Sequence, residues 1–101
     1  MITITKIFEI AYAHYLPNYN GKCANMHGHT GILEVEISGP IIREPYQGMI
    51  LDFGSFKEIV LEKILTKLDH QAAKLSIEIP TAENIVVWIA NELEKEFGYN
   101  L

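Results

Sequence analysis

The chain has 101 residues, of which 49% are apolar and 21% charged, and its formal net charge is −5. This length and composition predict one folded domain, and the negative charge excludes a basic surface for a nucleic-acid partner. No apolar stretch is long enough to span a membrane, so we expect no membrane partner. The N-terminus lacks the layout of a signal peptide, and a single cysteine cannot form an internal disulfide. We therefore expect a cytoplasmic protein.

Two stretches alternate between apolar and polar residues, which is typical of strands with one buried face. The first is ITITKIFEIAYAH, Ile2–His14, and the second is HTGILEVEISG, His29–Gly39. Between them lies a long loop, Tyr15 to Gly28, and loops of this length in small domains often carry function. After the second stretch we expect an irregular segment as far as Gly48.

A helical pattern begins after Asp52. The sequence from Ser55 to Glu58 has the form of a capping box, in which the serine caps the helix and the glutamate caps in return. Apolar residues then recur every three or four positions, which predicts an amphipathic helix from about Ser55 to Leu68. We interpret Asp52, which precedes the box, as a structural residue.

A second amphipathic helix is predicted to begin at Pro80-Thr81. Thr81 can cap it, Glu83 favours the positive helix end, and Gly98 is a suitable C-terminal stop. The expected buried stripe consists of Ile85, Ile89, Leu93 and Phe97. The order strand, strand, helix, helix predicts an α+β fold in which both helices cover one face of an antiparallel sheet.

Three histidines share one end of the expected covered face. His27 and His29 are two residues apart and project to the same side of a strand, which is the side of Leu33. His14 ends the first strand and has the parity of Ile10. If the strands pair, three imidazoles converge, which suits Zn²⁺ and leaves a fourth coordination position open, as in catalytic sites. The alternative is that these are hydrogen-bonded core histidines of a domain without a metal.

Cys23 precedes the histidine pair, and three interpretations of it stay open. It is a small buried apolar residue, a fourth zinc ligand that closes a structural site, or a thiolate that acts as a base or nucleophile. The pair Asp69-His70, directly after the first helix, also has two interpretations. Either the histidine interacts with the negative helix end, or the carboxylate orients an imidazole for proton transfer.

Five segments together resemble the family of 6-pyruvoyl-tetrahydropterin and 6-carboxytetrahydropterin synthases. In chain order they are AHYLP (Ala13–Pro17), CANMHGH (Cys23–His29), GMILDFG (Gly48–Gly54), LDH (Leu68–His70) and PTAEN (Pro80–Asn84). The resemblance implies the tetrahydropterin-synthase-like fold, or T-fold. It also implies that His14, His27 and His29 hold zinc. Cys23 is then a base rather than a ligand, and Asp69 and His70 relay protons.

The substrate implied by the resemblance is 7,8-dihydroneopterin triphosphate. A zinc-dependent lyase of this family would convert it to 6-carboxy-5,6,7,8-tetrahydropterin with loss of triphosphate and acetaldehyde, toward 7-deazaguanine (queuosine-type) synthesis. We favour this branch because the chain is short and compact, and because the loop between the first two strands, although long for a hairpin, is minimal for this family. The alternatives are the pyruvoyl-forming branch and a zinc-stabilised assembly module without turnover.

The sequence departs from the family pattern after the second helix. Family members continue into two further strands, the first of which carries a glutamate that anchors the pterin ring. Here the sequence ends at GYNL, and Glu83 does not obviously replace that anchor. We therefore expect residues 1–101 to be a single domain, truncated at its C-terminus, that keeps the zinc triad and binds pterin poorly. The family forms homo-oligomers, usually hexamers built as a dimer of trimers, which implies a homo-oligomer here.

Overall fold

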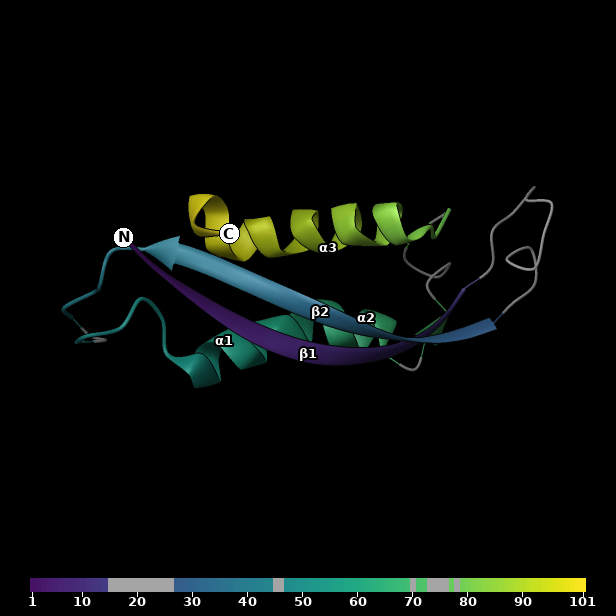
Figure 1. Ribbon diagram of the computed structural model, residues 1–101, viewed down its shortest axis with the longest axis horizontal. Coiled ribbons are helices and arrows are strands. Elements are labelled where there is room, and N and C mark those ends of the chain that lie inside the picture. Colours follow the sequence, from purple (N-terminus) through teal and green to yellow (C-terminus); the bar gives the residue numbers. More distant parts are fainter. Residues whose placement is uncertain (15–26, 45–46, 70, 73–76, 78) are drawn as a thin grey trace.

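Two long strands carry the rest of the structure (Figure 1). The computed structural model describes residues 1–14, 27–44, 47–69, 71–72, 77 and 79–101, and at positions 13, 14, 27, 71 and 72 it describes the main chain alone. β1 (Ile2–His14) and β2 (His27–Gly39) pair antiparallel over their whole length, from Ile2 opposite Gly39 to His14 opposite His27. The alternating pattern thus predicted both strands, although β2 begins two residues earlier than expected.

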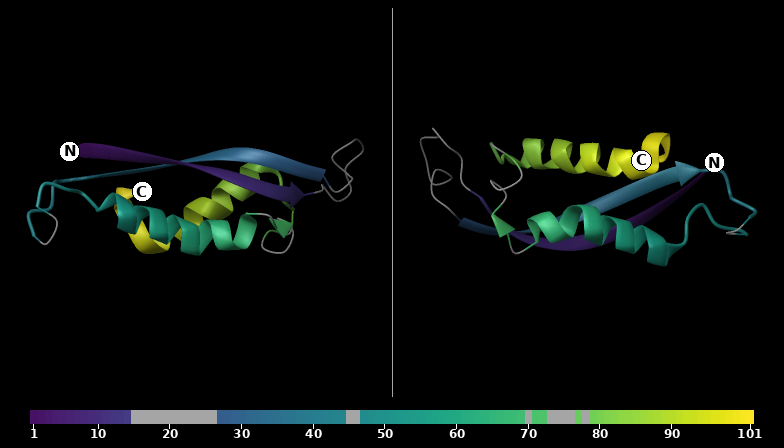
Figure 2. Two further views of the ribbon diagram at one scale, coloured as in Figure 1. Left: turned by 90° about the horizontal axis from the view of Figure 1, so that it is seen from below. Right: turned by 180° about the vertical axis from the view of Figure 1, so that it is seen from behind.

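The two faces of this ladder differ as the alternation predicts. Even-numbered residues of β1 and odd-numbered residues of β2 share one face, because cross-strand partners project to the same side. Its buried residues are Phe8, Ile10, Val35 and Ile37. The other face carries threonines and glutamates and also exposes Ile7 and Ile32. Figure 2 shows both helical segments on one side of the strands, so the expected α+β arrangement is confirmed.

The first helical segment is continuous but is not a uniform α-helix. It consists of α1 (Phe53–Val60), a π-helical stretch η2 (Leu61–Leu65) and α2 (Thr66–Leu68). Its fully buried residues occur at every fourth position: Phe56, Val60, Ile64 and Leu68. In an α-helix a four-residue step exceeds one turn by about 40°, so such a stripe would drift around the helix. The wider i→i+5 turn of η2 offsets this drift and keeps the stripe against the core.

The start of this segment differs from the prediction. Asp52 is the N-cap, and its Oδ2 accepts a hydrogen bond from the Ser55 amide at 3.0 Å. Ser55 lies in the first helical turn, so its interpretation as the cap of a capping box is wrong, whereas a structural role for Asp52 is confirmed. A carboxylate suits this position because it satisfies a free amide and also interacts with the positive helix end.

α3 (Ala82–Phe97) agrees closely with its prediction. Thr81 Oγ1 accepts a hydrogen bond from the Asn84 amide at 3.1 Å, and Gly98 follows the helix with a φ of 57°, which favours glycine. A 3₁₀ turn, η4 (Gly98–Asn100), comes next. The buried stripe contains Ile85, Ile89 and Leu93. Phe97 meets Phe56 edge-to-face with 5.6 Å between ring centroids, which joins α3 to α1.

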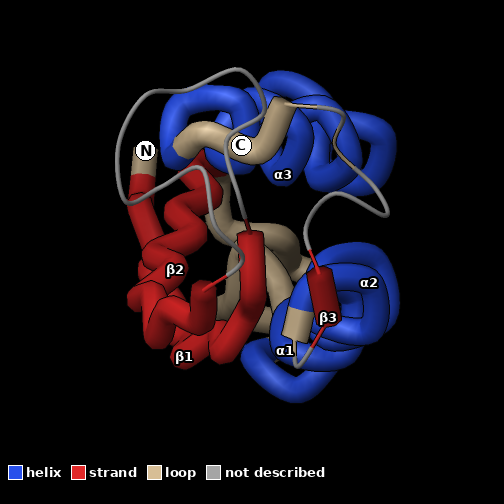
Figure 3. Tube along the Cα trace, turned by 90° about the vertical axis from the view of Figure 1, so that its right-hand side faces the viewer, coloured by secondary structure: helices blue, strands red, loops and turns tan. Residues whose placement is uncertain are grey.

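One element was not expected. β3 (Gln71–Ala72) is a two-residue strand that pairs parallel with β1 at Tyr12 and Ala13, so the strand order is β2-β1-β3. Figure 3 shows it beside the end of β1, next to α2. Two residues are too few to produce an alternating pattern. The strand matters because it pairs with the outer edge of β1 just before His14.

The outer surfaces of the two helical segments are joined by ion pairs. Lys63 lies 3.5 Å from Glu96, and Lys67 lies 3.8 Å from Glu92. Such exposed pairs contribute at most about 1 kcal/mol each to stability, so the helices are held mainly by the apolar stripe beneath. Across the described ranges, no helix has both the length and the apolar composition that crossing a membrane requires.

Candidate functional site

The paired ends of β1 and β2 bring the histidine positions together along the main chain. His14 lies opposite His27, and His29 lies opposite Tyr12. All four positions have the parity of the helix-covered face, at the end of the hairpin far from the N-terminus (Figure 1). The main chain thus has the register that a ligand set on positions 14, 27 and 29 requires. The side chains of His14 and His27 lie outside the described part of the structure, so the convergence of three rings stays a prediction.

The ring of His29 is described, and it stacks on Tyr12. The two ring centroids are 5.7 Å apart and the ring planes differ by 28°. Burial decreases along the covered face toward this end: Ile10 is 4% exposed, Tyr12 is half-buried and His29 is exposed. The imidazole is therefore supported on one side by an aromatic ring.

Gly31 borders this stacked pair. A Cβ atom at position 31 would be 3.4 Å from Cε1 of Tyr12. The φ of Gly31 is outside the left-handed region, so its backbone conformation does not require glycine, and only a side chain larger than a methyl group would crowd the Tyr12 ring. Sequence reasoning missed both Tyr12 and Gly31. The available signal was a glycine inside an otherwise regular strand, which often marks a close approach.

The carboxylate of Asp69 reaches from the end of α2 to β1. Its Oδ1 accepts a hydrogen bond from the Ala11 amide at 2.8 Å, and its own amide donates to the Leu65 carbonyl at 2.8 Å. This contact occupies the β1 edge one residue before β3 begins to pair there. Asp69 therefore ties the helix end to the strand that finishes at His14. The sequence singled out Asp69 but did not predict this partner.

The remaining predicted site residues are not tested by the structure. Cys23 and His70 lie outside the described residues, so their roles stay predictions. Among the side chains that are described, no three histidine, cysteine or acidic groups lie close enough to share a metal ion. That set contains His29 and Asp69 but lacks Cys23, His70 and the rings of His14 and His27, so the zinc prediction also stays open.

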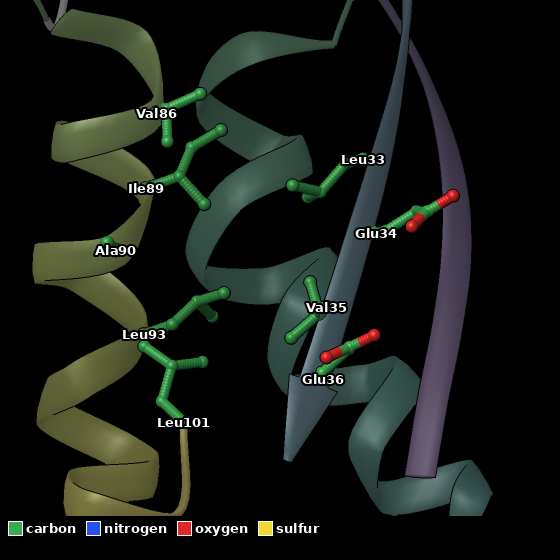
Figure 4. A pocket seen from close by; sticks show the side chains of 9 residues that line it. All are labelled: Leu33, Glu34, Val35, Glu36, Val86, Ile89, Ala90, Leu93 and Leu101. Carbon is green, nitrogen blue, oxygen red and sulfur yellow. The ribbon is translucent and has the colours of Figure 1, made fainter. Parts of the chain in front are cut away.

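A groove of about 320 Å³ lies elsewhere, between β2 and α3 (Figure 4). Its apolar lining comes from Leu33, Val35, Val86, Ile89, Ala90, Leu93 and Leu101. Glu34 and Glu36 border it but point away from α3 in Figure 4. The groove follows the middle of β2 rather than its first residues, and it is lined by no histidine or cysteine. It is therefore not the predicted metal site.

Arg43, the only arginine of the chain, lies far from the histidine positions. It follows β2, whereas His27 begins β2, and a strand of this length spans roughly 40 Å at about 3.3 Å per residue. Figure 1 shows the segment after β2 at the opposite end of the hairpin. Within one copy of the chain, Arg43 is too distant to contact a phosphate bound near His29.

Comparison with known proteins identifies the family. A family model described as 6-pyruvoyl tetrahydropterin synthase matches residues 3–101, and the chain belongs to that family. The resemblance carried by the five sequence segments is thereby confirmed.

Individual proteins similar to this chain carry names from the same family. A protein from Archaeoglobus fulgidus, provisionally named 6-carboxy-5,6,7,8-tetrahydropterin synthase, is 43% identical over 89 residues, which cover 88% of this chain and 72% of the relative. The 6-carboxy-5,6,7,8-tetrahydropterin synthase of Haemophilus influenzae is 44% identical over 71 residues, 69% of this chain but only 50% of its own length. The structure of Caenorhabditis elegans 6-pyruvoyl tetrahydropterin synthase superposes with a TM-score of 0.79 at 22% identity, over 98% of this chain and 81% of that one. This last likeness confirms the fold.

Proposed function

We propose that this protein is a zinc-dependent enzyme that forms 6-carboxy-5,6,7,8-tetrahydropterin. The reaction converts 7,8-dihydroneopterin triphosphate and water to this product, acetaldehyde and triphosphate. The observation that carries the proposal is the register that pairs His14 with His27 and leaves His29 two residues further on the same face. The two relatives named 6-carboxy-5,6,7,8-tetrahydropterin synthase support this branch of the family.

The donor set of the proposed site suits zinc. Three neutral imidazoles from His14, His27 and His29 are typical of catalytic zinc, which keeps a further position for water or substrate. A zinc ion bound there would act as a Lewis acid toward oxygens of the substrate side chain. The exposure of His29 supports the proposal, because a ligand at the surface of the described structure is accessible to both metal and substrate.

Three other residues are proposed to move protons. The Cys23 thiolate removes a carbon-bound proton from the substrate side chain, and His70 returns protons to the reacting atoms. Asp69 orients the His70 ring. The hydrogen bond from the Ala11 amide supports a role near the site, because it fixes the Asp69 carboxylate beside the strand that ends at His14.

Product analysis by mass spectrometry tests the function directly. The zinc-loaded protein is incubated with 7,8-dihydroneopterin triphosphate, and we expect 6-carboxy-5,6,7,8-tetrahydropterin and acetaldehyde in equal amounts. Formation of the 6-pyruvoyl product would assign the chain to the other branch. Cys23→Ala should lower turnover by about 10²-fold or more at unchanged zinc content, since a general base typically contributes 10²–10⁴-fold.

Cobalt substitution separates an enzyme from a zinc-stabilised module without turnover. If Cys23 is a base, the Co²⁺ protein should lack a thiolate-to-metal charge-transfer band. A strong band that disappears in Cys23→Ala would instead place the thiolate among the ligands, which describes a closed structural site.

We also propose that the chain forms homo-oligomers. On the open face of the sheet, Ile7 is 61% exposed and Ile32 is 70% exposed. Along the described strands, the outer edge of β2 has no partner, and such edges readily pair with another chain. Sedimentation velocity at micromolar concentration should therefore give a species larger than a monomer, and a monomer alone would contradict this part of the proposal.

A further inference from the structure

Tyr12 supports the one site histidine whose ring is described. It is not itself a predicted zinc ligand, yet its ring stacks on the His29 imidazole with 5.7 Å between centroids. We propose that Tyr12 is a positioning residue, which holds the His29 ring in place for metal binding. This inference rests on the proposed zinc site, and it deepens that proposal by naming a residue that acts through a ligand.

An exposed histidine near the end of a strand needs such support. Its side chain can adopt several rotamers, and binding a metal in only one of them costs conformational entropy. A stacked aromatic neighbour reduces the number of available rotamers before the metal arrives. Residues that orient a ligand from outside the coordination sphere commonly change metal affinity 10–100-fold when they are removed.

The main chain around Tyr12 is held on both sides. Tyr12 is paired with His29 in β2 and with Gln71 in β3. The amide of the preceding residue, Ala11, donates to Asp69 Oδ1 at 2.8 Å. The main chain of β1 is held at this point by two strands and one side chain. The position of the Tyr12 Cα atom is therefore fixed, and the ring contacts His29 from there.

Gly31 lies directly beside the stacked rings. A Cβ there would be 3.4 Å from Cε1, at the near limit of ordinary van der Waals contact, so the Tyr12 ring leaves room for little more than a methyl group at position 31. A branched side chain at this position would extend into the space that the ring occupies. Gly31 and Tyr12 thus give two independent ways to disturb the same contact.

The test compares zinc affinities of whole-chain variants by competition with a chromogenic chelator. Tyr12→Leu removes the aromatic ring, and we expect zinc binding to weaken about tenfold or more. Tyr12→Phe keeps the ring and is the matched control, with an affinity close to that of the wild type. Equal zinc affinity in Tyr12→Leu and the wild type would overturn the inference.

Gly31→Val keeps the inference testable even if Tyr12→Leu folds poorly. Valine favours extended structure and glycine weakens strands, which offsets the cost of moving the Tyr12 ring, so this variant should remain folded in a urea titration. Its zinc affinity should nevertheless fall, because the valine displaces the Tyr12 ring. A Gly31→Val protein that binds zinc as tightly as the wild type would contradict the proposed contact.

Failure of the zinc site itself would be recognised separately. In the metal-free protein, NMR relaxation of the His29 ring should show greater mobility in Tyr12→Leu than in Tyr12→Phe, whether or not zinc binds. A wild-type chain that binds no zinc would overturn the proposed function and the metal-positioning role together. Tight zinc binding with equally ordered His29 rings in all variants would overturn the positioning role alone.

Discussion

The middle and the end of the β1–β2 hairpin use the same register in different ways. In the middle, Phe8, Ile10, Val35 and Ile37 are buried beneath the helices. Toward the end burial decreases, and the contacts among the described side chains include the stacking of Tyr12 on His29 and the hydrogen bond from the Ala11 amide to Asp69. The difference indicates that folding stability is concentrated in the middle, whereas the end is free to carry ligand residues. Substitutions in the two regions should therefore change different properties.

The largest effect on stability is expected from Phe56→Ala. Phe56 is fully buried and contacts Phe97, so its truncation should cost about 3–5 kcal/mol of the free energy of unfolding. That is a large part of the 5–15 kcal/mol typical of a domain. Urea denaturation measures the loss, and the zinc affinity of the protein that remains folded should be unchanged. A parallel loss of zinc affinity would show that the two regions are coupled.

His29→Ala should have the reverse effect. Because His29 is exposed, its removal should change stability by no more than about 0.5 kcal/mol. Zinc affinity should fall by more than the roughly 100-fold that loss of a supporting residue costs. Thr30→Ala is a matched control, since Thr30 is the next residue and lies exposed on the opposite face. Zinc binding by His29→Ala at wild-type affinity would remove His29 from the ligand set.

Substitution of Asp69 should lower folding stability by an intermediate amount. Asp69→Ala leaves the Ala11 amide without this acceptor, which should cost about 1–3 kcal/mol of stability. Asp69→Asn retains an acceptor oxygen and should recover most of that loss. Hydrogen exchange at the Ala11 amide reports the contact directly. Unchanged protection of this amide in Asp69→Ala would contradict its assigned partner.

The smallest effect is expected on the helix surface, from Glu92→Gln. The hydrogen bond with Lys95, helped by the charges of Lys95, Lys67 and Lys63, holds the pKa of Glu92 below its ordinary value of 4.5. A carboxylate with a lowered pKa stabilises the fold above its ordinary pKa, and this contribution is lost as the pH falls through the folded-state value. The urea midpoint of Glu92→Gln should thus lie slightly below that of the wild type at neutral pH and match it in acid. If the urea midpoints of the two proteins differ equally at neutral and acid pH, the contribution of Glu92 to stability does not come from its charge.

Repeating patterns in the sequence predicted most of the fold. Two-residue alternation located β1 and β2, and Thr81 and Gly98 located both ends of α3. Features without a repeat were missed. β3 has only two residues, and the choice of Asp52 over Ser55 as the cap depends on where the chain leaves the preceding loop. The π-helical stretch was missed because its apolar residues keep a helical spacing.

The site was predicted only as far as strand parity allows. Alternation placed positions 14, 27 and 29 on one face, and the register agrees. The contact between Ala11 and Asp69 joins residues 58 positions apart, so no local pattern could reveal it. The stacking of Tyr12 on His29 likewise depends on which residues face each other across the hairpin. Local sequence identifies candidate ligands, but their supporting residues depend on the tertiary fold.

The wide turn of η2 amounts to one surplus residue stored within a helix. A gene that lost a single codon between positions 61 and 65 would encode a segment able to close into an ordinary α-helix. Leu68 and Asp69 would then keep nearly their present directions, toward the core and toward Ala11 respectively, because the wide turn already absorbs the extra residue. A codon gained in the same stretch and accommodated as α-helix would instead turn both residues by about 100°, so an insertion there should be far more harmful than a deletion.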